Sequence, residues 1–259
     1  MSRVFYDLHV DSNDFYGLMR FAQRLGWGGV CISHEFDSGF GSYKEEINKV
    51  KKETNIDILA GAMISVKSPE EVQAKARLAI QAGADLVLVE GGDEEINRAA
   101  SECWEVDVLC HPEKVSGKDL MDQKNSGIDH VMARFMAERC IALEINFSEI
   151  LGSYGMGRSQ VMARMRQNVM LAKKYGVPLA MTTGAQDKYC LRSPRDLLSV
   201  GLSLGMDEDL ARKALTDHPL RIVKKSRDRK DPDLLLKGLL VTDWGASENS
   251  KRKKMSGWY

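Results

Sequence analysis

The chain has 259 residues, of which 43% are hydrophobic and 29% are charged, and this composition excludes disordered, collagen-like and low-complexity proteins. Lys plus Arg and Asp plus Glu number 37 each, which argues against a uniformly basic nucleic-acid binder and against an acidic tail protein. Such a chain is long enough to bury one substantial core.

Short apolar or β-branched runs alternate along the chain with longer segments of helical period. The predicted strands are residues 4–10, 29–33, 56–66, 84–90, 106–110, 140–146 and 177–183. The predicted helices are residues 15–25, 43–53, 69–82, 94–101, 130–139, 159–175, 194–204 and 207–216. This alternation predicts right-handed crossovers and a parallel sheet.

The strand count favours a closed barrel over an open nucleotide-binding sheet. Residues 220–223 form a weak eighth strand candidate, and no GxGxxG motif follows the first strand. We expect an α/β, TIM-barrel-like (β/α) barrel as a single domain over residues 1–223, with a degenerate eighth strand. Residues 224–259 then form a basic C-terminal extension that is partly mobile.

Cysteine usage and the N-terminus bear on the compartment. The five cysteines are odd in number and none lies in a CxxC pair, so disulfides and a zinc knuckle are not expected. The N-terminus carries no signal-peptide pattern, and no uninterrupted apolar stretch has membrane-spanning length. We expect a soluble cytoplasmic protein with no membrane partner.

Charge is segregated along the chain despite the overall balance. Residues 1–149 carry 16 basic and 26 acidic side chains, whereas residues 150–195 carry 8 basic side chains and the single acid Asp187. This segregation is typical of a protein with one anionic partner.

The first strand carries a possible metal-binding pattern. Asp7, His9 and Asp11 alternate along it and would share one face at the barrel mouth, where His34 and His111 follow the second and fifth strands. Against a metal site, the third and seventh strands end without a carboxylate or an imidazole, whereas a multinuclear centre needs about six ligands. Histidines hydrogen-bonded to carboxylates explain the same pattern without a metal.

No nucleophile elbow, Walker A, HExxH or CxxC motif occurs in the chain. A sugar-phosphate enzyme of ordinary barrel type has a single hint, the turn Gly91-Gly92-Asp93.

Six cations follow two consecutive predicted strands. They are Arg158, Arg164, Arg166, Lys188, Arg192 and Arg195. In a barrel the two loops would be neighbours, so these side chains would share one rim and bind a polyanion such as RNA. The alternative is a solvated helix face. With aromatic residues at 7% and no aromatic run, base stacking is not expected.

Several sequence blocks resemble one family. They are YDLHV at the start, GRSQVMARMRQN at 157–168, KKYGVP at 173–178, TTGAQD at 182–187 and LRSPRDLLSVG at 191–201. Over residues 1 to about 225 the chain is similar to the archaeal ribonuclease P protein component 3 family.

The resemblance implies a TIM-barrel-like fold related to the PHP phosphoesterases. It also implies a protein subunit of ribonuclease P, the ribonucleoprotein that removes the 5′ leader of precursor tRNA. In that enzyme the RNA subunit performs the chemistry with Mg²⁺, so this chain would have no catalytic residue and no cofactor of its own. Its implied partners are ribonuclease P RNA, protein component 2, the other protein subunits and, indirectly, precursor tRNA. The alternative is a metal-dependent PHP-type phosphoesterase that uses Asp7, His9, Asp11, His34 and His111 as ligands.

Overall fold

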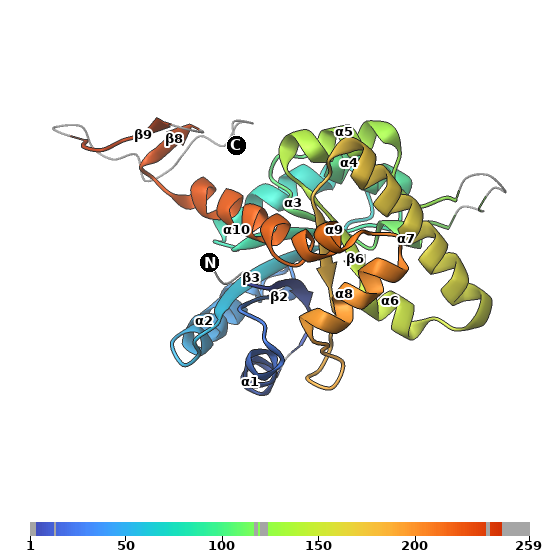
Figure 1. Ribbon diagram of the computed structural model, residues 1–259. Coiled ribbons are helices and arrows are strands. Elements are labelled where there is room, and N and C mark those ends of the chain that lie inside the picture. The colour runs from blue at the N-terminus through green and yellow to red at the C-terminus, as the bar shows by residue number, and fades with distance from the viewer. Residues whose placement is uncertain (1–3, 13, 117–118, 120–123, 237–238, 245–259) are drawn as a thin grey trace.

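The computed structural model describes residues 4–12, 14–116, 119, 124–236 and 239–244, and its main body is a barrel of parallel strands surrounded by helices (Figure 1). Seven strands pair in chain order, each parallel to the next. They are β1 (Tyr6–Val10), β2 (Gly29–Glu35), β3 (Asp57–Ile64), β4 (Leu86–Glu90), β5 (Val108–Cys110), β6 (Ala142–Asn146) and β7 (Leu179–Thr182). The predicted parallel barrel is confirmed.

The helices surround this barrel, and α10 covers one of its ends. They are α1 (Phe15–Leu25), α2 (Phe40–Lys51), α3 (Glu70–Gln81), α4 (Glu94–Glu102), η1 (Pro112–Lys114), α5 (His130–Arg139), α6 (Phe147–Gly152), α7 (Gly155–Tyr175), α8 (Pro194–Ser203), α9 (Glu208–Lys213) and α10 (Asp217–Lys230). The sequence did not predict α6 or α10, and it placed the start of α7 four residues too late. None of the helices in the described part of the chain is long and apolar enough to cross a membrane.

The barrel closes between β1 and β7 through a few hydrogen bonds. At the carboxyl end of the strands, Asp11 N donates to Ala185 O at 2.9 Å and Gly184 N donates to His9 O at 3.1 Å. At the opposite end, Tyr6 N and Met181 N donate to the carbonyls of Leu215 and Ala214. A turn after α9 therefore occupies the place that an eighth strand would take.

The predicted eighth strand over residues 220–223 is wrong, because these residues lie in α10. Ile222 and Val223 are buried against Leu8 and other residues inside the barrel. A four-residue apolar run does not distinguish a strand from a buried helix turn, and here the helix uses it to fill the barrel. Helix α10 also spans the predicted domain boundary, so residues 224–230 continue a helix that packs on the barrel.

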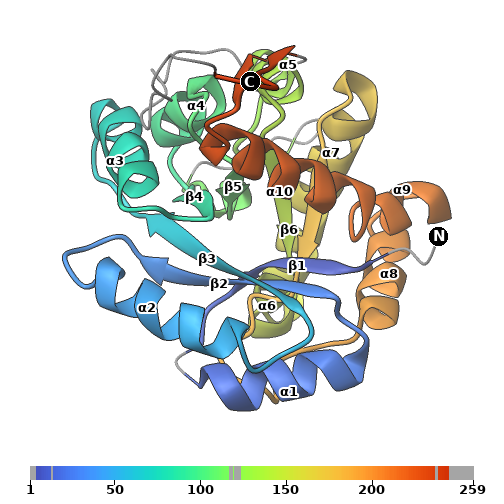
Figure 2. The ribbon, with the colours of Figure 1, turned by 90° about the vertical axis from the view of Figure 1, so that its left-hand side faces the viewer.

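Helix α10 closes the end of the barrel at which the strands begin (Figure 2). Acidic residues at or just before the starts of β3, β4 and β5 meet the cations of α10: Asp57 pairs with Arg227, Asp85 with Lys230, and Asp107 with Arg229 and Lys225. These ion pairs involve four of the ten basic residues that the sequence assigns to the C-terminal extension.

Beyond α10 the chain forms a small separate hairpin of β8 (Leu234–Leu236) and β9 (Leu239–Leu240), which pair antiparallel. Residues 245–259, which include the basic stretch Lys251 to Lys254, lie outside the described residues. The prediction of a partly mobile extension is therefore not tested there.

Candidate functional site

A polar cavity of about 530 Å³ lies at the barrel mouth, where the carboxyl ends of the strands meet. It is lined by His9, Asp11, Ser33, His34, Glu35, Asp37, Met63, Ser65, Glu90, His111, Lys114, Asn146, Ser148, Glu149, Gly184 and Gln186. The lining includes five carboxylates and a single ammonium group, so the electrostatic potential of the mouth repels an anion. The structure thus brings four of the five predicted candidate ligands, His9, Asp11, His34 and His111, to one cavity.

The fifth candidate, Asp7, does not line the cavity. The pairing of β1 with β2 shifts register between Asp7 and Val10, so the alternation that would aim Asp7, His9 and Asp11 at one point is broken. Asp7 is fully buried and accepts hydrogen bonds from the Thr183 hydroxyl and from the backbone N–H groups of Thr183 and His9. Burial raises the pKa of Asp7 to about 7, although these hydrogen bonds oppose the shift. The carboxyl group therefore ties β1 to β7.

Glu144, at an inward position of β6, organises the floor of the mouth. Its Oε1 lies 2.6 Å from His9 Nδ1 and accepts from the Thr182 hydroxyl at 2.7 Å and from Asn146 Nδ2 at 3.2 Å. Its Oε2 accepts from the His111 backbone N–H at 3.1 Å. A carboxylate can only accept here, so His9 Nδ1 carries the hydrogen.

These contacts fix the charge states of the pair. Although burial alone would raise the pKa of Glu144, the charge of His9 and these hydrogen bonds hold it well below its usual range. The charge of Glu144 likewise outweighs burial at His9 and raises the pKa of the imidazole. The pair is a buried, hydrogen-bonded ion pair when His9 is protonated.

The residues after β5 are strained and poorly solvated. His111 adopts a left-handed backbone with φ of 49°, which is uncommon for a residue other than glycine. Two residues on, Glu113 is 3% exposed, and neither oxygen of its carboxyl group has a hydrogen-bond partner among the described residues. Burial, together with the charges of Glu144 and Glu149, raises the pKa of Glu113 to about 8.

This raised pKa predicts a stability gain from Glu113→Gln. The folded-state pKa exceeds the unfolded one, so stability present at low pH is lost as the pH rises through about 8. Glu113→Gln removes that loss, and we expect its free energy of unfolding to exceed the wild-type value at pH 8.5 by a few kcal/mol, on the order of 3, but not at pH 4. Urea unfolding at both pH values measures this, with the exposed Glu94→Gln as the control. An equal effect at both pH values would contradict the explanation.

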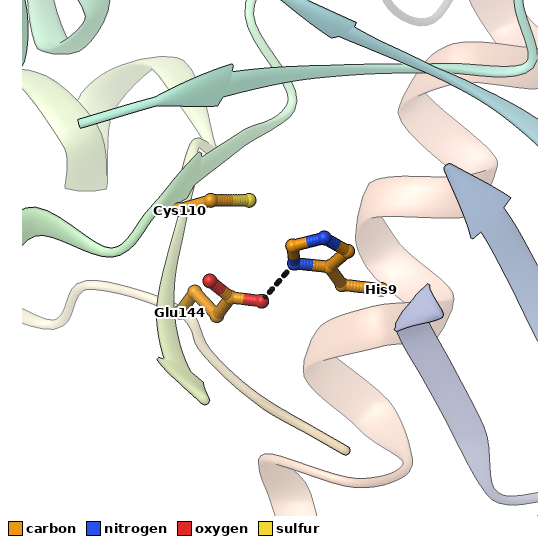
Figure 3. Close-up of side chains that lie close together, drawn as sticks. All are labelled: His9, Cys110 and Glu144. Carbon is orange, nitrogen blue, oxygen red and sulfur yellow. Dashed lines mark hydrogen bonds and ion pairs between the residues drawn. The ribbon is translucent and has the colours of Figure 1, made fainter. Parts of the chain in front are cut away.

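Within the described residues, the closest group of potential metal ligands is His9, Cys110 and Glu144, whose ligand atoms lie within 4.8 Å of one another (Figure 3). Both oxygens of Glu144 already accept hydrogen bonds, and burial raises the pKa of the Cys110 thiol well above its usual value. A metal would have to displace the contact between His9 and Glu144 and deprotonate a buried thiol. These donors do not fit the multinuclear centre of a phosphoesterase.

The poor fit predicts that chelation will not destabilise the protein. We expect EDTA to leave the melting temperature unchanged within about 1 °C, because a stabilising metal adds its binding free energy to folding. Differential scanning calorimetry with and without EDTA, together with elemental analysis of the purified chain, measures this. A stoichiometric transition metal, or a melting temperature lowered by several degrees, would contradict the interpretation.

Beside the mouth, four cations lie on the neighbouring loops after β6 and β7 and in the helix turns that follow them. We call Arg158, Lys188, Arg192 and Arg195 the cationic rim. The loops pack closely: Gly184 has φ of +57°, and a Cβ atom there would lie 2.3 Å from Asn146 Oδ1.

Contacts within the cationic rim orient its guanidinium groups. Arg192 donates to the Tyr189 carbonyl at 2.8 Å and lies over the Phe147 ring of α6. Arg158 donates to the Ser153 carbonyl at 2.8 Å. In the described part of the chain, the cationic rim makes no ion pair with a carboxylate within 4.0 Å. Its charge is available to an anion.

The structure places Arg164 and Arg166 away from the other four predicted cations. Arg164 is 7% exposed and donates to the carbonyls of Glu113 and Val115 and to Asp119, so it holds the segment after β5 on α7. Arg166 is exposed but bonds to the Ser203 carbonyl at the far end of α8. A helix rises 1.5 Å per residue, so both lie roughly 9–12 Å along α7 from Arg158. Although Arg164 and Arg166 are close to Arg158 in the sequence, the length of α7 carries them away from the cationic rim.

Sequence reasoning missed several residues that shape the site. Glu144 stands at an inward position within the apolar strand residues ALEIN, and a carboxylate in such a run was the available signal. The turn Gly91-Gly92-Asp93 serves the fold, because Asp93 accepts from the first backbone N–H groups of α4 and Gly92 donates to Asn97. The hydrogen bonds of this turn therefore give no support to a sugar-phosphate site.

Comparison with known proteins places this fold and site in a family. The family model described as RNase P subunit p30 matches residues 4–231. Ribonuclease P protein component 3 of Methanosarcina barkeri is 30% identical over 250 residues, covering 93% of this chain and 97% of that protein. The protein of the same name from Methanothermobacter thermautotrophicus is 29% identical, covering 87% and 91%.

Solved structures share the fold of this chain. One chain of a cryo-EM structure of archaeal ribonuclease P with mature tRNA superposes with a TM-score of 0.73 at 27% identity, covering 88% of this chain and 94% of that one. Molinate hydrolase shares the fold at a TM-score of 0.58 but at 12% identity, covering 86% of this chain and 73% of that one. The family match extends over the whole barrel and α10, and the chain therefore belongs to the RNase P subunit p30 family.

Proposed function

We propose that this chain is a non-catalytic protein subunit of ribonuclease P that binds the RNA subunit and supports removal of the 5′ leader from precursor tRNA. The observation that carries the proposal is the match over residues 4–231, together with the superposition on a chain of archaeal ribonuclease P.

The site supports a binding role. The mouth is acidic and its central carboxylate is saturated with hydrogen bonds, which suits neither phosphate binding nor a metal-activated water. The cationic rim, by contrast, presents three guanidinium groups and one ammonium group that are not paired with carboxylates in the described residues. One guanidinium group can donate two parallel hydrogen bonds to two oxygens of a phosphate, so the RNA backbone is the partner that this surface fits.

The other partners follow from the same proposal. Protein component 2 and the remaining protein subunits would bind elsewhere on the barrel. Precursor tRNA would be contacted indirectly, and the RNA subunit would use Mg²⁺ for the chemistry. The five free cysteines support a reducing, cytoplasmic location.

An add-back experiment tests the proposal. Ribonuclease P RNA is combined with component 2, with and without the purified chain, at two salt concentrations, and precursor tRNA cleavage is measured. We expect the chain to stimulate cleavage, more so at the lower salt, and to cleave nothing when the RNA is omitted. No stimulation, or cleavage without RNA, would contradict the proposal.

A further inference from the structure

Exposed aromatic and apolar side chains accompany the cationic rim. Tyr154, between α6 and α7, is 78% exposed, Met156 in the first turn of α7 is 91% exposed, and Tyr189 in the loop before α8 is 76% exposed. Figure 1 shows α6, the start of α7 and the loop before α8 at the same end of the barrel. Exposed apolar side chains gathered in this way mark a contact surface.

Each exposed tyrosine has a cation against its ring. Arg158 Cζ lies 5.4 Å from the centroid of the Tyr154 ring, and Lys188 Nζ lies 5.3 Å from that of Tyr189. The cation covers part of one ring face, and the high exposure leaves the rest of the ring open. Each pair therefore offers a flat apolar surface and a positive charge side by side.

The two pairs lie on the segments that follow the neighbouring strands β6 and β7. Arg192 holds the second segment against the start of the first, because it donates to the Tyr189 carbonyl and lies 5.9 Å from the centroid of Phe147, the first residue of α6. The acidic residues Glu35, Asp37 and Glu90 line the mouth cavity and repel a polyanion from the barrel centre.

An unpaired nucleotide has the complementary chemistry, a flat base next to a phosphate. We propose that Tyr154 and Tyr189 stack unpaired bases of RNA while Arg158, Lys188 and Arg192 bind the adjoining phosphates. This inference rests on the proposed function and specifies its ligand as single-stranded RNA rather than the backbone of a duplex. It revises the expectation from the sequence, where an aromatic content of 7% and the absence of an aromatic run gave no sign of stacking.

The alternative occupant of such a surface is another protein. Charge favours RNA, because the apolar side chains are interspersed with cations that make no ion pair with a carboxylate in the described residues, and a polyanion would neutralise them. Exposed aromatic side chains flanked by Arg and Lys are the arrangement that single-stranded nucleic acid uses, since every base has a ring face.

Three probes separate stacking from phosphate binding. They are a 12-nucleotide single-stranded uridine RNA, an abasic strand with the same backbone, and a 12-base-pair RNA duplex, each titrated with the full chain at low salt by fluorescence anisotropy. Tyr154→Ala with Tyr189→Ala should weaken binding of the uridine strand roughly 10- to 100-fold and leave the abasic strand and duplex unchanged. Tyr154→Phe with Tyr189→Phe keeps the rings and should bind like wild type.

Arg158→Ala with Arg192→Ala should weaken the binding of all three probes. If the alanine variant of the tyrosines binds the uridine strand like wild type, stacking is refuted. In that case phosphate contact is still supported if the arginine variant binds the probes more weakly than wild type. Loss of component 2 binding in the tyrosine variant, with RNA binding unchanged, would identify a protein interface and also refute stacking. If the wild-type chain neither binds any probe nor stimulates precursor tRNA cleavage, the proposed function itself fails.

Discussion

Replacing both Arg158 and Arg192 by alanine is expected to lower the affinity of the chain for ribonuclease P RNA by about 10- to 100-fold near physiological salt. Each guanidinium that neutralises a phosphate displaces a condensed counterion, so losing two contacts should reduce the slope of log affinity against log salt by roughly 1.5. Precursor tRNA cleavage at limiting chain concentration should fall in parallel. Filter binding at several salt concentrations measures the affinity and the slope.

The control for this prediction is Arg166→Ala. Arg166 is equally cationic, but it lies along α7 and bonds to Ser203, away from the cationic rim. We expect its affinity and salt slope to stay near wild type. Equal losses in the two variants would mean that general charge, and not the position of the rim, attracts the RNA.

The second large effect is expected at the opposite end of the barrel. Asp107→Asn should reduce the free energy of unfolding by about 3–5 kcal/mol, the usual consequence of leaving buried cations without their counter-charge. Asp107 is fully buried, and its two oxygens accept from Arg229 at 3.2 and 2.7 Å, while Lys225 Nζ lies 3.4 Å away. Urea unfolding at pH 7 measures the loss.

Glu208→Gln provides the matched control on the surface. Its ion pair with Arg212 within α9 has a comparable distance of 2.7 Å but is exposed to solvent. Such pairs contribute less than about 1 kcal/mol. If Asp107→Asn cost no more than this control, α10 would not be held on the barrel by its buried ion pairs.

The barrel could be predicted from the sequence because each of its strands is an apolar run long enough to stand out between helical segments. The seven strands were found at nearly their observed positions for that reason. Helix α10 escaped prediction because its sequence, DHPLRIVKKSRDRK, is dominated by charge. Asp107, the carboxylate partner of both Lys225 and Arg229, lies more than 100 residues away in the sequence, and no local pattern records such pairs.

The site was predictable in part, because the topology of a barrel brings the loops after neighbouring strands together. That rule placed Arg158 and Arg192 on the segments that follow the neighbouring strands β6 and β7. It failed for Asp7, which a register shift in β1 turns away from the mouth, and for Arg164, which turns inward to hold the segment after β5. Register and helix rotation depend on packing across the whole barrel, and spacing along the chain does not encode them.

The central claim is that the cationic rim, not the barrel mouth, carries the activity of this subunit. Precursor tRNA cleavage by reconstituted ribonuclease P tests it most directly when Arg158→Ala with Arg192→Ala is compared with His34→Gln, a substitution at the edge of the mouth cavity. We predict that the arginine variant needs at least 10-fold more chain for half-maximal cleavage and that the histidine variant matches wild type. Normal cleavage with the arginine variant and lost cleavage with the histidine variant would contradict this account.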